Sequence, residues 1–372
     1  MSHRPRHIRN DAPLSSRDPH KQLVASLTRL VTDHPPENVP PGGGLYYGPL
    51  SIAFLFFKLQ VLYPGLEIEE IPVTGWGGAY LKRAKAHMKQ YHGPSMSKCG
   101  VADDILVLLA VGAASTADSD MAAELCNYAA VTTDPSATSE WLYGRAGYLY
   151  LLRLARASFA NDRKVSDMID DTANEVIESI MDAQRPWKWH GKNYVGAVHG
   201  SFGIITQIVL TEPSYAPKLE AELGALLSYQ YVGGNWPSTL PPGSDRLVQF
   251  CHGAPGVVAS LLSIKRYFPK LKDRIDAAIR KGRECIWERG LLTKEPCLCH
   301  GISGNALALD DKECEHFLTY TTGHEIKSMI KEGLMERSDD PSALWCGEAG
   351  RAWAWAVVDR GLEKRFLGYN DV

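Results

Sequence analysis

The sequence predicts an all-α fold, an α/α toroid in which inner helices surround an axis and outer helices pack against them. Glycine-centred motifs recur roughly 50 residues apart, and strand signals between them are sparse. A unit of that size leans on its neighbours to bury its apolar face, so the repeats must stack. Seven motif glycines are present: Gly48, Gly100, Gly144, Gly200, Gly253, Gly301 and Gly347.

The residues between the motifs alternate between two kinds of helical segment. Apolar runs directly follow the first five glycines, such as IITQIVL after Gly200, and they predict helices that are buried nearly all round. Charged segments such as 217–229 and 270–288 carry an apolar stripe on one side only, so they predict outer helices. No terminal unit has become a polar cap, which an open solenoid needs, so we expect a closed ring.

Composition and charge indicate which partners and which cellular compartment to expect. A net charge of -3 gives no field that would draw the chain onto nucleic acid or anionic lipid. The longest apolar run, residues 49–57, is well short of the ~20 residues that span a bilayer, so we expect no transmembrane segment. Eight cysteines without a signal-like start favour reduced thiols in the cytoplasm over a disulfide framework.

The expected domain organisation is a tail followed by one domain. The first residues are basic and rich in proline, arginine and serine, which is typical of a disordered segment. We therefore expect a disordered tail over residues 1–40 and a single toroid domain over residues 41–372. Proline- and glycine-rich stretches further along are interpreted as loops between helices.

The positions just before the motif glycines hold the candidate metal-binding and catalytic side chains. His199, His252 and His300 directly precede a glycine, and Cys251 and Cys299 stand one place earlier in two neighbouring units. Equivalent positions in a repeat lie at the same height on the rim where the inner helices begin. Zinc favours tetrahedral sulfur and nitrogen ligands, and a catalytic zinc keeps three protein ligands and one open position. The register therefore predicts a zinc site made by Cys251, Cys299 and His300.

Two alternatives to this ligand set stay open. Cys297 lies three residues before His300, which is also ligand spacing, although it precedes the register shared by Cys251 and Cys299. His252 could bind the ion in place of His300. A single Cys-His pair next to glycine is also a common core feature, and only the repetition of the pair favours a metal.

Four motifs resemble those of the lanthionine synthetase C-like family, in its eukaryotic branch. They read LYGRAGYLYLL, NYVGAVHGSFGI, CHGAPG and CLCHGISGNA, and the likeness covers about residues 43–358. The resemblance implies an α/α toroid, zinc ligands at Cys251, Cys299 and His300, and a catalytic histidine at His199. The family includes bacterial cyclases that add peptide cysteine thiols to dehydroamino acids and eukaryotic relatives linked to glutathione. The seventh motif, CGEAGRAW, departs from the family pattern at Cys346 and Arg351.

The ligand set favours thiol activation. A zinc ion with two thiolate ligands is a poor Lewis acid for water and a good holder of a third thiolate. We expect that thiolate, from glutathione or from a cysteine, to add to a dehydroamino acid or similar electrophilic alkene. His199 or His252 would supply the proton, and Arg246 and Arg145 would pair with a carboxylate of glutathione or of a modified peptide or protein.

A second class of function is a zinc-containing adaptor that binds glutathione or a protein without turnover. A closed structural site and an open catalytic site can share the same three ligands, so the sequence keeps both functions open.

Overall fold

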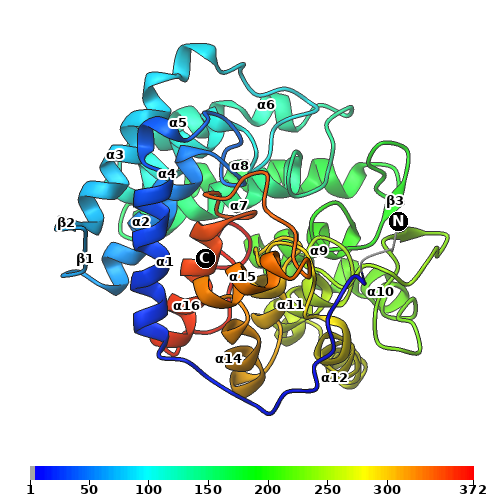
Figure 1. Ribbon diagram of the computed structural model, residues 1–372. Helices are drawn as coiled ribbons and strands as arrows, with labels where there is room; N and C mark the ends of the chain where they lie inside the picture. Colours follow the sequence, from blue (N-terminus) through cyan, green and yellow to red (C-terminus); the bar gives the residue numbers. More distant parts are fainter. Residues whose placement is uncertain (1–4) are drawn as a thin grey trace.

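The structure, a computed structural model, describes residues 5–372 and has two concentric layers of helices (Figure 1). This is the predicted α/α toroid. The inner helices are α2 (Pro49–Leu62), α4 (Asp104–Thr116), α7 (Arg145–Arg156), α9 (Ser201–Thr211), α11 (Ala254–Ile264), α13 (Ile302–Ala306) and α16 (Glu348–Asp359). The outer helices are α3 (Val73–Ala86), α5 (Ser119–Asn127), α8 (Arg163–Asp182), α10 (Ala216–Leu227), α12 (Lys272–Arg289), α14 (Asp311–Thr319) and α1 (Pro19–Asp33).

Each inner helix begins shortly after a motif glycine, as the repeat register predicts. Helices α2, α9 and α11 are buried along nearly their whole length, whereas α12 buries one stripe that includes Ile275, Ile279 and Ile286. The ring closes where α16 meets α2, and there the backbone N–H of Trp345 donates to the carbonyl of Tyr46 at 3.1 Å. All seven helix starts therefore face one rim.

The remaining elements are short. Helices α6 (Ala129–Thr132) and α15 (Gly323–Lys331) lie outside the inner ring. Two antiparallel hairpins pair β1 (Glu67–Ile68) with β2 (Ile71–Pro72) and β3 (Asn193–Tyr194) with β4 (Thr239–Leu240). Among residues 5–372, no helix is long and apolar enough to cross a membrane.

Helix α1 corrects the expectation of a disordered tail over residues 1–40. The helix is capped by the side chain of Asp18, and it buries Leu23, Leu27 and Leu30 against α16. It is thus the outer helix of the seventh unit. The prediction was wrong because the basic composition before residue 19 concealed an i, i+4, i+7 apolar stripe directly after it. Residues 1–4 lie outside the described residues.

The axis of the toroid is filled by aromatic side chains. Trp345 packs edge-on against Trp141, with ring centroids 4.9 Å apart, and Phe250 approaches it to the same distance. Phe366 and Tyr369, from the segment after α16, also pack against Phe250. These aromatic contacts form a packed cluster next to Phe250 and Trp345, which directly precede rim residues.

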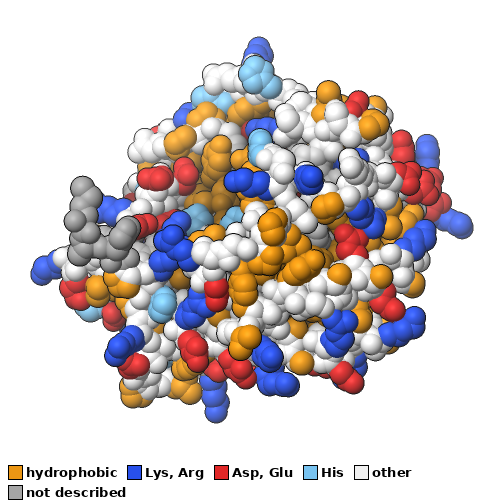
Figure 2. Space-filling view, turned by 90° about the vertical axis from the view of Figure 1, so that its right-hand side faces the viewer, with side chains coloured by type: hydrophobic (Ala, Val, Ile, Leu, Met, Phe, Trp, Pro, Cys, Tyr) orange, Lys and Arg blue, Asp and Glu red, His pale blue; other side chains and the backbone are white. Residues whose placement is uncertain are grey.

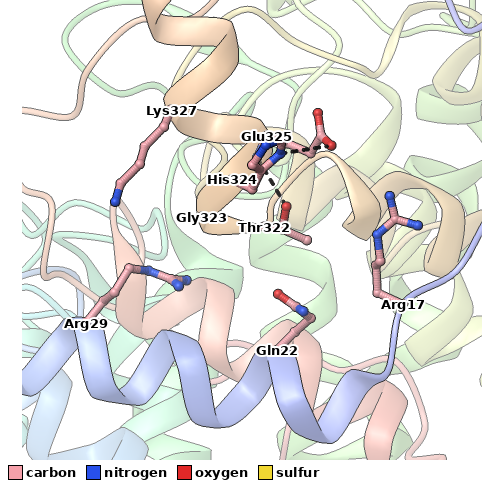
Figure 3. A pocket seen from close by; sticks show the side chains of 8 residues that line it. All are labelled: Arg17, Gln22, Arg29, Thr322, Gly323, His324, Glu325 and Lys327. Carbon is pink, nitrogen blue, oxygen red and sulfur yellow. Dashed lines mark hydrogen bonds and ion pairs between the residues drawn. The ribbon is translucent and has the colours of Figure 1, made fainter.

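A buried charge cluster fixes α1 to α16. The carboxylate of Glu348 pairs with Arg29 of α1 at 2.8 Å and with Arg351 of its own helix. Burial alone would raise the pKa of Glu348, but the charges of Arg351 and Arg29 outweigh it and lower the pKa to about 2. Figure 3 shows Arg29 beside a cavity of about 510 Å³ between α1 and the start of α15.

Replacing Glu348 with glutamine is expected to destabilise the fold by about 3 to 5 kcal/mol, because it leaves two arginines without their buried partner. In the wild type the folded pKa lies below the ordinary value of 4.5, so this stabilisation is complete above that value and is lost as the pH falls toward 2. Urea unfolding at neutral and acidic pH measures both effects. Asp167→Asn, which removes an exposed pair with Arg163, is the matched control and should cost under ~1 kcal/mol. Equal losses for the two variants would contradict the prediction.

Candidate functional site

Backbone hydrogen bonds along the rim hold the two cysteines side by side. The N–H of Cys251 donates to the carbonyl of Cys299 at 3.1 Å, and the N–H of Cys299 donates to the carbonyl of Trp345 at 2.9 Å. With the Trp345 to Tyr46 bond, these contacts join three successive units and close the ring. Residues at equivalent positions of neighbouring repeats are therefore in direct contact at this part of the rim.

Gly253 shows why the motif needs glycine. Its φ is +111°, a conformation that side chains rarely allow, and a Cβ there would lie 2.1 Å from the carbonyl oxygen of Leu247. The tight turn places Cys251 and His252 immediately before α11, facing the centre of the rim.

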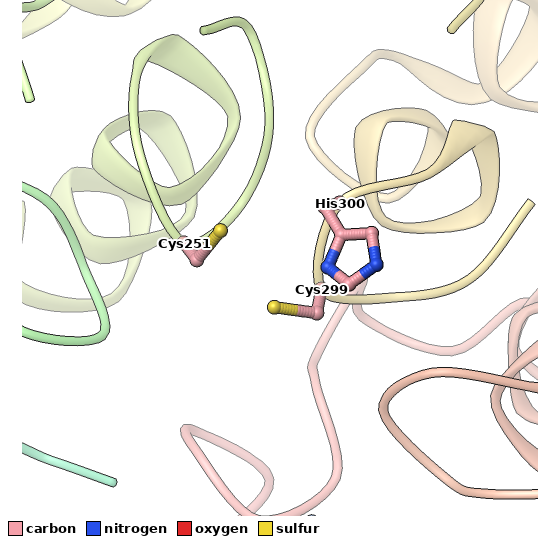
Figure 4. Close-up of side chains that lie close together, drawn as sticks. All are labelled: Cys251, Cys299 and His300. Atoms are coloured by element: carbon pink, nitrogen blue, oxygen red, sulfur yellow. The ribbon is translucent and has the colours of Figure 1, made fainter. Parts of the chain in front are cut away.

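Cys251, Cys299 and His300 form a compact trio (Figure 4). Their ligand atoms all lie within 4.8 Å of one another. Both cysteines are buried, and the side chain of His300 is 20% exposed. Ligands of a tetrahedral zinc lie about 3.5 to 4 Å apart, so the three donors fit the ion with only small movements.

The environment of Cys251 favours its thiolate, whereas the hydrogen bond with Cys251 and burial raise the pKa of Cys299. Gln249 donates its side-chain N–H to Cys251 Sγ at 3.0 Å, and Tyr46 donates its hydroxyl to Cys299 Sγ at 2.9 Å. The hydrogen bond from Cys299, with the nearby His252 and His300, holds the pKa of Cys251 well below its usual value. Burial, with Cys299 next in effect, raises the pKa of Tyr46 well above its usual value, so the phenol stays a donor.

A second trio shares His300. Its Nε2 lies 2.5 Å from Glu295 Oε1, and its backbone N–H donates to Cys297 Sγ at 3.4 Å. The ligand atoms of Glu295, Cys297 and His300 also lie within 4.8 Å of one another. The structure thus brings Cys297, the alternative ligand, to His300, but on the side of Glu295.

His199 is held by a buried carboxylate that sequence reasoning did not single out. Its Nδ1 lies 2.7 Å from Glu140 Oε2, and Glu140 is 1% exposed. The backbone N–H groups of Leu142 and Tyr143 also donate to this carboxylate, which fixes it in place. An ionised carboxylate can only accept, so Nδ1 carries the proton and Nε2 is the nitrogen available to a reactant.

Aromatic rings lie around His199 and His252, the two rim histidines outside the trio. Trp189 stacks on His199 with centroids 3.9 Å apart and planes 2° apart, and Tyr194 of β3 lies beside both His199 and His252. The rings of His199 and His252 are 5.9 Å apart. Figure 2 views the molecule from the side of β3, where the surface is hollowed, with hydrophobic side chains on the walls and histidines at the floor.

The two predicted arginines lie in different surroundings. Arg246 is exposed on the loop before Cys251. Arg145 is buried at the start of α7, where it donates to Ser139 and Ser179, and it lines a cavity of about 470 Å³ that Trp189 also lines. Trp189 thus contacts His199 and also lines this cavity.

The fold and the rim define the class of this protein: an α/α toroid whose rim carries a Cys-Cys-His trio that can hold a metal ion. The chain belongs to the lanthionine synthetase C-like protein family, whose model matches residues 40–350. The resemblance carried by the glycine motifs is therefore confirmed.

Individual relatives agree with this assignment. The chain is 32% identical over 183 residues to a zebrafish (Danio rerio) protein named glutathione S-transferase LANCL1, which covers 45% of this chain and 44% of the relative. It is 27% identical over 256 residues to the LanC-like protein GCL1 of Arabidopsis thaliana, covering 62% and 57%. The chain thus spans about half the length of the curated relatives it matches. Nisin cyclase has the same fold, with a TM-score of 0.63 over 94% of this chain and 96% of the cyclase, at 13% identity.

Proposed function

We propose that this protein activates a thiol on a zinc ion held by Cys251, Cys299 and His300 and adds it to an electrophilic alkene. The thiol is glutathione or a cysteine, the acceptor is a dehydroamino acid or a similar alkene, and the product is a thioether. The relative named as a glutathione S-transferase and the fold shared with a cyclase support thiol addition as the general chemistry. One observation carries the proposal: two cysteines and a histidine converge within 4.8 Å on the rim that also holds the His199–Glu140 pair.

The proposed chemistry balances without a further reactant. When bound, the ion keeps a thiol deprotonated and nucleophilic at neutral pH. The sulfur forms a bond to the β-carbon of the alkene, and the π electrons move toward the neighbouring carbonyl. His199 Nε2 takes up the proton that the thiol loses, directly or through solvent, and then donates it to the α-carbon, while Glu140 stabilises the imidazole in its charged form. The proton that the thiol loses equals the proton that the product gains.

A cavity on the Glu295 side of His300 could hold the charged ends of glutathione. It has a volume of about 760 Å³ and is lined by Glu295, Ser338, Lys331 and Arg337, among others. Glu295 contacts His300, and Ser338 donates to the carbonyl of Cys346, so two residues that line the cavity also contact rim residues. Lysine and arginine here can pair with the two carboxylates of glutathione, and Arg337 offers the planar fork that matches a carboxylate.

Replacing Arg337 with alanine is expected to raise the KM for glutathione about 10-fold or more and to change kcat little. Loss of a hydrogen bond to a charged group costs ~1.5–3 kcal/mol, and Arg337 would act equally on the ground state and the transition state. Steady-state kinetics with varied glutathione measures the split. Arg163→Ala on α8 is the control, and a kcat loss with unchanged KM would contradict the role.

The acceptor would use the other side of the histidines. Arg145, whose buried charge has serine hydroxyls as side-chain partners, lines the same cavity as Trp189 and could pair with a carboxylate of a modified peptide. Arg246 is a second candidate for such a pair at the exposed edge. The eight cysteines are all free and buried, which favours a reducing compartment such as the cytoplasm.

Mass spectrometry of glutathione mixed with a dehydroalanine- or dehydrobutyrine-containing peptide tests the proposal. The wild type should produce the thioether adduct at a rate well above the uncatalysed rate. Zinc content and glutathione binding without any adduct, across varied acceptors, would instead establish the non-catalytic adaptor.

A further inference from the structure

The contact between Glu295 and His300 has a second consequence for the metal site. Figure 4 shows the two ring nitrogens of His300 on opposite sides of the ring, one of them toward Cys251. The nitrogen that contacts Glu295 is Nε2. Nδ1 is therefore the nitrogen that faces the two sulfurs.

The short distance distinguishes a shared proton from a shared metal. Glu295 Oε1 and His300 Nε2 are 2.5 Å apart, which is hydrogen-bond distance. Oxygen and nitrogen atoms bound to one tetrahedral zinc, each about 2.0–2.2 Å from it, lie roughly 3.3 Å apart. The Cys297 thiol donates to the same carboxylate, with its sulfur 3.8 Å from Glu295 Oε1, and that sulfur accepts the backbone N–H of His300 at 3.4 Å. The second trio thus has the geometry of a support for His300 and not of a second metal site.

The structure assigns Glu295 as a positioning residue: its carboxylate accepts the Nε2–H of His300 and thereby presents the Nδ1 lone pair to the metal. This inference rests on the proposed zinc site. A carboxylate behind a ligating histidine fixes the tautomer and the ring orientation and makes the histidine a stronger ligand.

The loop that carries Glu295 is itself held rigidly. Its backbone carbonyl accepts the N–H of Cys297 at 2.8 Å, and the carbonyl of Pro296 accepts the Ser303 hydroxyl at 2.6 Å. Gly301 lets the loop fold onto the start of α13, since a Cβ there would lie 2.1 Å from the Glu295 carbonyl oxygen. The Glu295 side chain is 13% exposed and lines the 760 Å³ cavity, so a ligand in the cavity would meet the carboxylate that supports His300.

The test measures zinc affinity by competition with a chromophoric chelator, without reference to activity. Glu295→Ala should weaken zinc binding 10- to 100-fold. Glu295→Gln keeps a neutral acceptor oxygen and should lose less, because a hydrogen bond to a charged acceptor is about twice as strong. Glu332→Gln, an exposed glutamate of the neighbouring loop, and Cys297→Ser should leave the affinity within about twofold.

A spectroscopic measurement separates positioning from general structural support. In zinc-loaded protein labelled with ¹⁵N-histidine, His300 should carry its proton on Nε2 in the wild type. In Glu295→Ala that proton should exchange faster, while the thermal midpoint of the metal-free variant stays near that of the wild type.

Three results would overturn the inference. They are unchanged zinc affinity in Glu295→Ala, a proton on Nδ1 of His300, and zinc loss in Cys297→Ser as complete as in Cys299→Ala. A wild type that binds no zinc would instead defeat the proposed function itself, so the two failures are distinguishable.

Discussion

Replacing Cys299 with alanine is expected to remove zinc from the protein and to abolish thioether formation. Two ligands, Cys251 and His300, would remain, and Tyr46 would lose the sulfur to which its hydroxyl donates. Loss of one of three ligands leaves an incomplete site that cannot hold the ion at ordinary concentrations. Elemental analysis should give about one zinc per chain for the wild type and almost none for the variant.

The matched control for this variant is Cys314→Ala. Cys314 is equally buried, but it lies in α14, outside both trios that contain His300. It should retain zinc and activity, apart from a modest loss of stability. Full zinc retention by Cys299→Ala would rule out the assigned ligand set, and zinc loss by both variants would point to unfolding.

Replacing His199 with asparagine is expected to slow adduct formation by about 10²- to 10⁴-fold, the usual contribution of a general acid. Zinc content should stay the same, because His199 lies outside the trio and contacts Glu140 and Trp189. The thiol would still bind and lose its proton, but no group at the same position could protonate the α-carbon. Single-turnover kinetics with a dehydroalanine peptide measures the step directly.

Two comparisons define this result. His324→Asn, on the exposed start of α15, should leave the rate unchanged. Glu140→Gln should also slow the reaction, because a neutral side chain stabilises the charged imidazole less. If His199→Asn keeps the full rate, the proton comes from another group, and His252, whose ring is 5.9 Å away, becomes the first candidate.

The arrangement of the toroid could be predicted because each repeat carries a short glycine motif that is recognisable in the sequence. The glycines at 253 and 301 mark the starts of inner helices, and aligned motifs become neighbours on one rim. The role of α1 could not be predicted from the motifs, since it packs on α16 from more than 300 residues away along the chain. Its Leu23, Leu27 and Leu30 stripe was the available signal.

In the site, too, the residues within the motifs could be predicted, whereas a contact between distant loops could not. Cys251, Cys299 and His300 share the register, and the structure brings them together. Glu140 lies four residues before Gly144, a position at which none of the other six motifs has an acidic residue. Its pairing with His199 depends on how two loops meet across 59 residues, and no local periodicity reports such a contact.

X-ray absorption at the zinc edge, recorded with and without glutathione, tests the central claim most directly. Without the thiol, the ion should have two sulfur ligands and one histidine nitrogen, with its remaining coordination completed by a light atom. Saturating glutathione should add a third sulfur, and that increase should be absent with S-methylglutathione. Three or more protein sulfurs before glutathione is added, or an unchanged sulfur count afterwards, would contradict thiol activation at this site.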